Sequence, residues 1–165
     1  MIVYLVGMPG SGKTTVGREL AGRLGVPFFD LDEEIERERG RSVVQIFRED
    51  GESAFRAIEA AALVDASRHD PAVVSCGGGV VLETANRITL RNTGSCVFID
   101  VPLDELRERV RPSEDRPLIR SGQDLDRLLA EREPLYREFA AHVVDGRGGP
   151  AEVAEAIVEE LRWSA

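Results

Sequence analysis

The chain contains a single lysine, which lies in a glycine-rich segment with the spacing of a phosphate-binding loop. Of the 21 lysine and arginine residues, only Lys13 is a lysine. The segment 7–14 reads GMPGSGKT and matches the P-loop pattern G-x-x-x-x-G-K-[ST]. Such a loop needs a compact ammonium that folds back onto the β- and γ-phosphates, a space for which a planar guanidinium is too large and too directional. The lone lysine therefore indicates nucleoside triphosphate binding, with an ordinary glycine-rich turn as the alternative.

Two carboxylates, Asp30 and Asp32, follow the short apolar pair Phe28 and Phe29. If this segment is extended, residues i and i+2 point the same way, so both carboxylates would face one site. One carboxylate could then support Mg²⁺ through water, while the other accepts a proton from a substrate hydroxyl or orients it. The alternative is a D-x-x-E helix start, in which Asp30 caps a helix together with Glu33. The residues alone leave both interpretations open.

Three consecutive glycines, 77–79, follow an apolar strand expected at 72–76. Glycine removes the side chain at places where another group must approach the backbone. Because ligands gather at the carboxyl ends of parallel strands, we expect that group to be a ligand. A plain turn is the alternative.

Two arginines, Arg56 and Arg132, could bind an anionic group of a substrate. Arg56 precedes Glu59 by three residues, so a surface i,i+3 ion pair is the alternative. Arg132 begins the segment REPLY, for which a solvated helix face is the alternative. Taken singly, neither arginine is diagnostic.

The segment 111–123 is polar, rich in proline and arginine, and flanked by expected helices. We interpret it as a mobile lid, because kinases use such segments to exclude water and to bring an arginine onto the transferring phosphoryl group. A solvated loop is the alternative.

Strands and helices alternate along the chain, which predicts a parallel sheet covered by helices on both faces. The apolar run 2–6 reads as a buried strand before the glycine loop, and 13–24 reads as the helix after it. The further expected strands are 28–29, 72–76, 95–101 and 142–145. The further expected helices are 31–39, 43–49, 52–67, 103–110, 124–140 and 151–162.

Composition narrows the class of protein. With 165 residues, 42% hydrophobic and 31% charged, the chain is expected to form one soluble domain. A net charge of −9 argues against nucleic acid or an anionic membrane as the main partner. The absence of a long apolar run and of a signal-peptide pattern predicts a cytoplasmic enzyme. The two cysteines, Cys76 and Cys96, lie in strand-like segments and are expected to be buried thiols.

Taken together and in order, the motifs resemble those of the shikimate kinase family. The matching segments run along nearly the whole chain and read GMPGSGKTTVGREL, FFDLD, IFREDGESAFRAIE, SCGGG, RPLI and REPLY. The resemblance implies an α/β, nucleoside-monophosphate-kinase-like three-layer P-loop fold with a central five-stranded parallel sheet. It also implies a single kinase domain over 1–165, with a lid at about 111–123 and a substrate-binding region at about 30–60. The implied reaction is ATP-dependent phosphorylation of the shikimate 3-hydroxyl in chorismate and aromatic amino acid synthesis.

The resemblance also implies a role for each matching residue. ATP phosphates would be bound by Gly10, Ser11, Gly12, Lys13, Thr14 and Thr15. Mg²⁺ would be held by Thr14 directly and by Asp30 through water. Shikimate would be bound by Asp32, Arg56, Gly77, Gly78, Gly79 and Arg132. The catalytic residues would be Lys13, Asp32 and the lid residue Arg116, which also contacts ATP, and Arg147 is matched to a residue that packs on adenine.

Two other readings are possible, one of the same class of function and one of a different class. One is another small P-loop kinase that acts on gluconate or a nucleoside monophosphate. The other is a non-catalytic nucleotide-binding module. The paired aspartates, the triple glycine and two candidate carboxylate-binding arginines favour the shikimate-type reading. The expected partners are therefore the small molecules shikimate and ATP, with no nucleic acid and no membrane, and the expected assembly is a monomer.

Overall fold

The computed structural model describes residues 1–110 and 118–163. Its elements, in chain order, are β1 (Ile2–Val6), α1 (Lys13–Leu24), β2 (Phe28–Asp30), α2 (Leu31–Arg39), α3 (Val43–Asp50), α4 (Glu52–Ala66), β3 (Ala72–Ser75), the 3-10 helix η1 (Val80–Leu82), α5 (Thr84–Thr93), β4 (Gly94–Asp100), α6 (Leu103–Arg109), α7 (Gly122–Phe139), β5 (His142–Asp145) and α8 (Pro150–Trp163).

Five strands form one parallel sheet in the order β2-β3-β1-β4-β5. The central strand β1 pairs with β3 on one side and with β4 on the other, so that Tyr4 lies opposite both Val74 and Cys96. All five residues of β1 are buried, which agrees with a strand covered on both faces. The predicted parallel α/β sheet is therefore confirmed.

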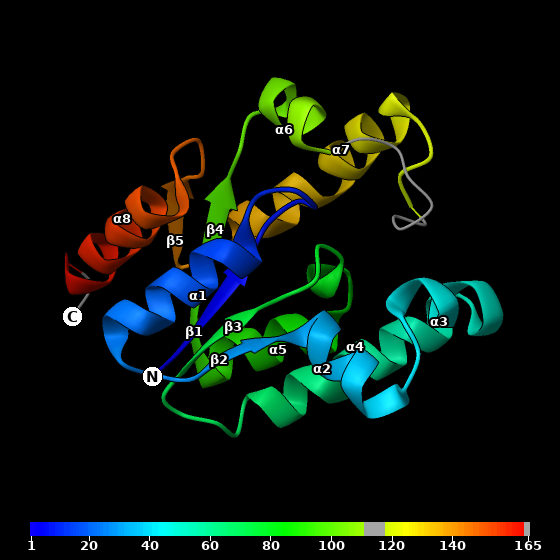
Figure 1. The fold of residues 1–165 in the computed structure, drawn as a ribbon, viewed down its shortest axis with the longest axis horizontal. Coiled ribbons are helices and arrows are strands. Elements are labelled where there is room, and N and C mark those ends of the chain that lie inside the picture. Colours follow the sequence, from blue (N-terminus) through cyan, green and yellow to red (C-terminus); the bar gives the residue numbers. More distant parts are fainter. Residues whose placement is uncertain (111–117, 164–165) are drawn as a thin grey trace.

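Helices cover both faces of the sheet and give a three-layer arrangement (Figure 1). Helices α1 and α8 pack against each other, and α5 and α7 pack on β4. A smaller apolar cluster, formed by Ile35, Ile46 and Phe55, joins α2, α3 and α4 into a separate helical region beside the main core. This region corresponds to the segment expected to bind the substrate.

Local sequence explains where the helices around the site begin. Helix α1 starts directly after Gly12, whose φ of 87° lies in the left-handed region that glycine tolerates. Helix α2 is capped by Asp30, whose side chain accepts from the backbone amides of Asp32 and Glu33. Helix α3 begins with a capping box between Ser42 and Gln45. Each helix start is therefore held by chemistry that is local in sequence.

The sequence patterns missed one helical stretch. Residues 80–93 carry no expected element, whereas the structure places η1 and α5 there. Only Asn86 and Leu90 of α5 are buried, so its apolar stripe is too narrow to give a clear helical period.

The strand predicted at 95–101 begins and ends one residue earlier, at Gly94 and Asp100. Both cysteines are free and buried, as expected.

Candidate active site

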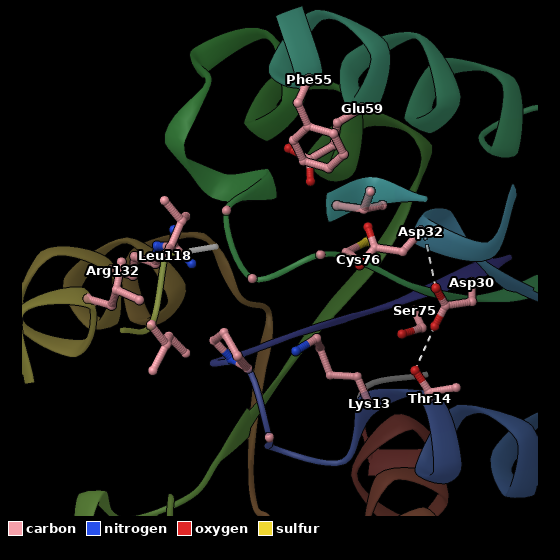
Figure 2. A pocket seen from close by; sticks show the side chains of 18 of the residues that line it. Lys13, Thr14, Asp30, Asp32, Phe55, Glu59, Ser75, Cys76, Leu118 and Arg132 are labelled. Carbon is pink, nitrogen blue, oxygen red and sulfur yellow. Dashed lines mark hydrogen bonds between the residues drawn. The ribbon is translucent and has the colours of Figure 1, made fainter. Parts of the chain in front are cut away.

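A cavity of about 540 Å³ opens at the carboxyl ends of β1, β2 and β3, where ligands bind in parallel α/β folds. Segments that are distant in sequence meet there, as Figure 2 shows for Lys13, Asp32, Glu59 and Arg132. The sequence-predicted site residues that line it are Gly10, Gly12, Lys13, Thr14, Thr15, Asp30, Asp32, Arg56, Gly77, Gly78, Gly79 and Arg132.

Lys13 is held tightly within its own loop. Its Nζ donates to the carbonyl oxygens of Gly7 and Met8, each at 2.9 Å, and lies 3.4 Å from the hydroxyl of Ser11. Burial lowers the pKa of Lys13 to about 8, although the nearby charge of Asp32 opposes that shift. An ammonium that is partly stripped of water at the end of a glycine loop is well suited to bind phosphate oxygens.

The loop conformation requires glycine at Gly10 and Gly12. Both have positive φ angles, 82° and 87°, in the region that other residues rarely adopt. At Gly10 a Cβ would also lie 2.1 Å from a methyl carbon of Val110. The backbone is therefore free to approach a ligand closely and to point its amides toward an anion.

Asp30 caps α2, as one of the two alternatives predicted, and it also contacts Thr14 of the phosphate loop. Its Oδ1 accepts from the backbone amide of Asp32 at 3.0 Å, which is helix capping. Its Oδ2 accepts from the hydroxyl of Thr14 at 2.6 Å, which ties β2 to the phosphate loop. The segment is not extended through both residues, because the strand ends at Asp30 and Asp32 lies in the first turn of α2. Both carboxylates nevertheless line the cavity.

Asp32 lies where its carboxylate is difficult to ionise. Burial, followed by the neighbouring charges of Asp30 and Glu59, raises its pKa to about 7, while Lys13 opposes the shift. A carboxyl with a pKa near 7 is ionised in a large fraction of the molecules at neutral pH. It is also basic enough to accept a proton from a substrate hydroxyl.

The other end of the cavity contains two buried arginines. Arg132 is only 3% exposed, so the alternative of a solvated helix face is wrong. The i,i+3 pair of Arg56 with Glu59 exists at 2.8 Å, but it is buried and not on the surface. Arg56 also lies over the rings of Phe55 and Phe47, at 5.3 and 5.9 Å from their centroids. The apolar surroundings strengthen the interaction of both guanidinium groups with an anion.

Unpaired buried atoms mark this end of the cavity. Four buried side-chain nitrogen or oxygen atoms lack a hydrogen-bond partner within residues 1–110 and 118–163. Three of them, Nε of Arg56, Nε of Arg132 and Oε2 of Glu59, belong to residues that line the cavity. Because a buried polar group without a partner is costly, their clustering indicates a polar ligand there.

The glycines 77–79 leave space for close neighbours and are not needed for backbone conformation, because none of them has a positive φ. A Cβ on Gly77 would lie 2.8 Å from Oε2 of Glu59. A Cβ on Gly78 would lie 3.1 Å from Nη1 of Arg132, and one on Gly79 would lie 2.3 Å from Nη2 of Arg56. The predicted approach to the backbone is therefore real, but the groups that make it are the side chains that line the cavity.

Two predicted site residues, Ser11 and Arg147, do not line this cavity. Arg147 is exposed and pairs with Asp145, with Nε at 3.0 Å from both carboxylate oxygens, beside a separate hollow that Asp100 also lines. Its contact with adenine stays a prediction. Arg116 and most of the expected lid lie outside the described residues, although Leu118 and Ile119 line the cavity.

Sequence reasoning missed two charged residues at the site. Glu59 was considered only as a surface partner of Arg56, yet it is buried and lines the cavity. Arg109 carried no motif, yet its guanidinium donates to the carbonyl of Gly146 at 3.1 Å and to that of Gly10 at 3.5 Å. The signal for Glu59 was its helical spacing from Arg56, whereas nothing in the local sequence indicated Arg109.

The described residues offer few metal ligands in one place. No group of three or more histidine, cysteine, aspartate or glutamate side chains could hold a metal ion in that part of the chain. Thr14 and Asp30 instead offer two oxygen atoms beside the phosphate loop.

None of the described helices is long and apolar enough to cross a membrane.

Comparisons with known proteins agree on one family. The family model described as shikimate kinase matches residues 9–162. A shikimate kinase from Halorhodospira halophila is 46% identical over 164 residues, covering 97% of this chain and 93% of that protein. Another from Paracidovorax citrulli is 42% identical over 152 residues, covering 89% and 83%.

Solved structures place the fold in the same group. The shikimate kinase from Acinetobacter baumannii in complex with shikimate superposes with a TM-score of 0.95 at 36% identity, covering 99% of this chain and 93% of that one. A gluconokinase from Sinorhizobium meliloti reaches a TM-score of 0.64 at 23% identity, covering 99% and 96%. The second likeness shows the shared fold alone.

Proposed function

The chain belongs to the shikimate kinase family, and on that premise we propose how its residues divide the work of phosphorylating shikimate. ATP binds with its phosphates on the loop 7–14, and shikimate binds between α2, α4, α7 and the glycines 77–79. The phosphoryl group passes from ATP to the shikimate 3-hydroxyl, giving shikimate 3-phosphate and ADP.

One observation carries this assignment. A single cavity brings the phosphate-loop lysine, a carboxyl that titrates near neutral pH, and two buried arginines together. This grouping supports a phosphoryl donor site next to a carboxylate-binding site. This juxtaposition is what a kinase for a small acidic alcohol needs, because phosphoryl transfer depends mostly on positioning and on stabilisation of charge.

At the donor end, the residues 10–15 bind the phosphates of ATP. Lys13 exchanges its bonds to Gly7 and Met8 for bonds to phosphate oxygens, and it stabilises negative charge that develops during transfer. Bound phosphate also favours the charged form of Lys13, which reverses part of the effect of burial on its pKa.

Arg116 is proposed to add positive charge from the lid, so Arg116→Ala is expected to lower kcat more than it raises the shikimate KM.

The oxygen atoms of Thr14 and Asp30 suit Mg²⁺, which prefers oxygen ligands, keeps several waters and is often held by substrate phosphates. The scarcity of other ligands among residues 1–110 and 118–163 fits an ion that arrives with ATP. When bound, Mg²⁺ would supply charge neutralisation on the phosphate oxygens. Thr14 would hold it directly and Asp30 through water.

At the acceptor end, Asp32 orients the 3-hydroxyl and accepts its proton as the oxygen bonds to phosphorus. Its raised pKa, about 7, suits this role because the proton is taken up near the working pH. Asp30 is differently placed, since both of its carboxylate oxygens already accept hydrogen bonds from α2 and Thr14. The two neighbouring carboxylates therefore have separate tasks.

Arg56 and Arg132 bind the shikimate carboxylate, a planar anion that matches the guanidinium fork. Glu59 holds the guanidinium of Arg56 at 2.8 Å and thus limits the directions in which it can donate. The apolar rings of Phe47 and Phe55 line the same cavity and suit the carbon ring of the substrate.

We further propose that the protein works as a cytoplasmic monomer whose partners are shikimate and ATP, without nucleic acid or membrane. The net charge of −9 supports the exclusion of polyanionic partners. Sedimentation of the purified protein with and without both substrates would test the monomer.

The deciding experiment measures ADP release by the purified protein with ATP and Mg²⁺. Shikimate, gluconate and several nucleoside monophosphates are compared as acceptors, with Lys13→Ala as the control for contaminating kinases. We expect rapid release only with shikimate. Equal or faster turnover with gluconate or a nucleotide would contradict the assignment.

A further inference from the structure

Tyr136 is buried beside the acceptor end of the cavity without lining it. It lies on α7 one turn after Arg132, so the two side chains share a face of the helix. Its side chain is fully buried, and its ring stacks on Phe98 of β4 with centroids 5.1 Å apart. A phenylalanine would provide the same packing, so the hydroxyl needs a separate explanation.

That hydroxyl donates a hydrogen bond to the carbonyl oxygen of Gly78. The carbonyls on either side have backbone donors, since Gly77 accepts from the amide of Val80 and Gly79 from the amide of Leu82, each at 3.1 Å. The Gly78 carbonyl is thus held by a side chain from another element. Because a trans peptide is planar, fixing this carbonyl also fixes the amide N–H of Gly79, which points in the opposite direction.

The same phenol interacts with Arg132. Burial raises the pKa of Tyr136 to about 12, and the charge and hydrogen bonding of Arg132 counteract part of that shift. The phenol therefore remains protonated and able to donate at neutral pH. Nη1 of Arg132 would lie 3.1 Å from a Cβ on Gly78, so the arginine, the glycine and the phenol are in close contact.

We propose that Tyr136 is a positioning residue for shikimate, whose hydroxyl sets the relative placement of the Gly78–Gly79 peptide and the Arg132 guanidinium. Both are groups that the proposed function gives to substrate binding, and the inference rests on that assignment. Tyr136 does not line the cavity itself, so it acts through these two groups.

The chain provides a matched control for loss of a buried tyrosine hydroxyl. Tyr4, the other of its two tyrosines, is also fully buried and shares a hydrogen bond of 2.7 Å with the hydroxyl of Thr93. Neither Tyr4 nor Thr93 lines the cavity. Tyr4→Phe and Tyr136→Phe thus remove the same atom, one away from the site and one beside it.

The test is steady-state kinetics of both variants, together with their Tm. Leaving the Gly78 carbonyl without its donor is expected to raise the shikimate KM of Tyr136→Phe by about five- to a hundredfold. We expect the ATP KM to change by less than about twofold, because the partners of the Tyr136 hydroxyl, Gly78 and Arg132, are assigned to shikimate. In Tyr4→Phe both KM values should stay at the wild-type level while Tm falls.

An unchanged shikimate KM in folded Tyr136→Phe would overturn the inference, as would equal rises in both KM values. The proposed function is tested separately by Arg132→Lys. If that change raises the shikimate KM and Tyr136→Phe does not, only the inference fails. If wild-type protein does not phosphorylate shikimate, the proposed function fails first.

A measurement on the unmutated fold covers the case in which Tyr136→Phe does not fold. Protein labelled with 3-fluorotyrosine should give two fluorine resonances, which Tyr4→Phe assigns, because the chain has two tyrosines. Added shikimate should shift the Tyr136 resonance and leave that of Tyr4 in place. A Tyr136 resonance that does not respond to saturating shikimate would overturn the inference.

Discussion

The two ends of the cavity are built in different ways. At the donor end, one continuous segment supplies the loop, the lysine and the start of α1, and Lys13 finds its hydrogen-bond acceptors within that segment. At the acceptor end, α2, α4, α7 and the loop after β3 each supply part of the lining. There, three buried polar atoms lack a partner in the described part of the chain.

This difference separates what local sequence can specify from what the whole fold must assemble. A phosphate loop functions through backbone amides and one ammonium, so nearly all its information lies in eight consecutive residues. A site for a small acidic alcohol needs charges placed several ångströms apart, which distant elements must bring together. Substitutions at the two ends should therefore change different kinetic constants.

The largest effect is expected for Lys13, at the donor end. Lys13→Ala removes the only ammonium near the transferring phosphoryl group, and kcat should fall on the order of 10²–10³-fold. Lys13→Arg keeps the charge but not the compact shape, so it should also be poor. The measurement is kcat at saturating ATP and shikimate. A near-normal kcat for Lys13→Arg would show that the lone lysine has no special chemical role.

The second effect concerns pH and the acceptor end. Because the pKa of Asp32 is raised to about 7, its carboxyl becomes protonated as pH falls below that value and can no longer accept a proton. We expect kcat/KM for shikimate to fall about tenfold per pH unit below pH 7. Far-ultraviolet circular dichroism over the same range controls for unfolding. A constant kcat/KM down to pH 5 would contradict the role of Asp32.

Smaller changes are expected when the substrate arginines keep their charge. Arg56→Lys and Arg132→Lys lose the planar fork, and losing a charge-assisted hydrogen bond costs about 1.5–3 kcal/mol. The shikimate KM should therefore rise roughly ten- to a hundredfold, with the ATP KM nearly unchanged. Arg23→Lys is the matched control, because Arg23 pairs with Glu19 and Glu155 away from the cavity. Equal rises in both KM values would remove the distinction between the two ends.

The sequence predicted the donor end well because its signals are local. The strand 2–6, the helix 13–24 and the loop between them appear with the predicted bounds. Family resemblance then supplied Arg56 and Arg132, whose own neighbourhoods favoured surface positions. Burial of these arginines arises when α4 and α7 pack around the glycines 77–79, which no local pattern encodes.

Other features were not predictable for related reasons. Asp30 was expected either to cap a helix or to serve the site, but a carboxylate has two oxygens: one caps α2 and the other accepts from the Thr14 hydroxyl. Strand order places β3 between β1 and β2, so segments about seventy residues apart pair, which periodicity alone does not reveal. Helix α5 escaped notice because it buries so few residues.

The last effect is on stability and not on catalysis, and it tests whether the acceptor end is strained by its function. The pKa of Asp32 is about 7 in the fold against an ordinary 3.8, so between these values the folded state binds a proton that the unfolded chain does not. Stability is therefore lost as pH rises through this range, by at most about 4 kcal/mol. Asp32→Asn removes this cost, so the Tm of the variant should exceed that of the wild type at pH 8. The difference should be roughly 2–4 °C per kcal/mol recovered, and it should be smaller at pH 5. Asp65→Asn, at an exposed position, is the control and should not alter the pH dependence of Tm. An Asp32→Asn difference that is the same at both pH values would show that this carboxyl is not held near neutrality by the fold.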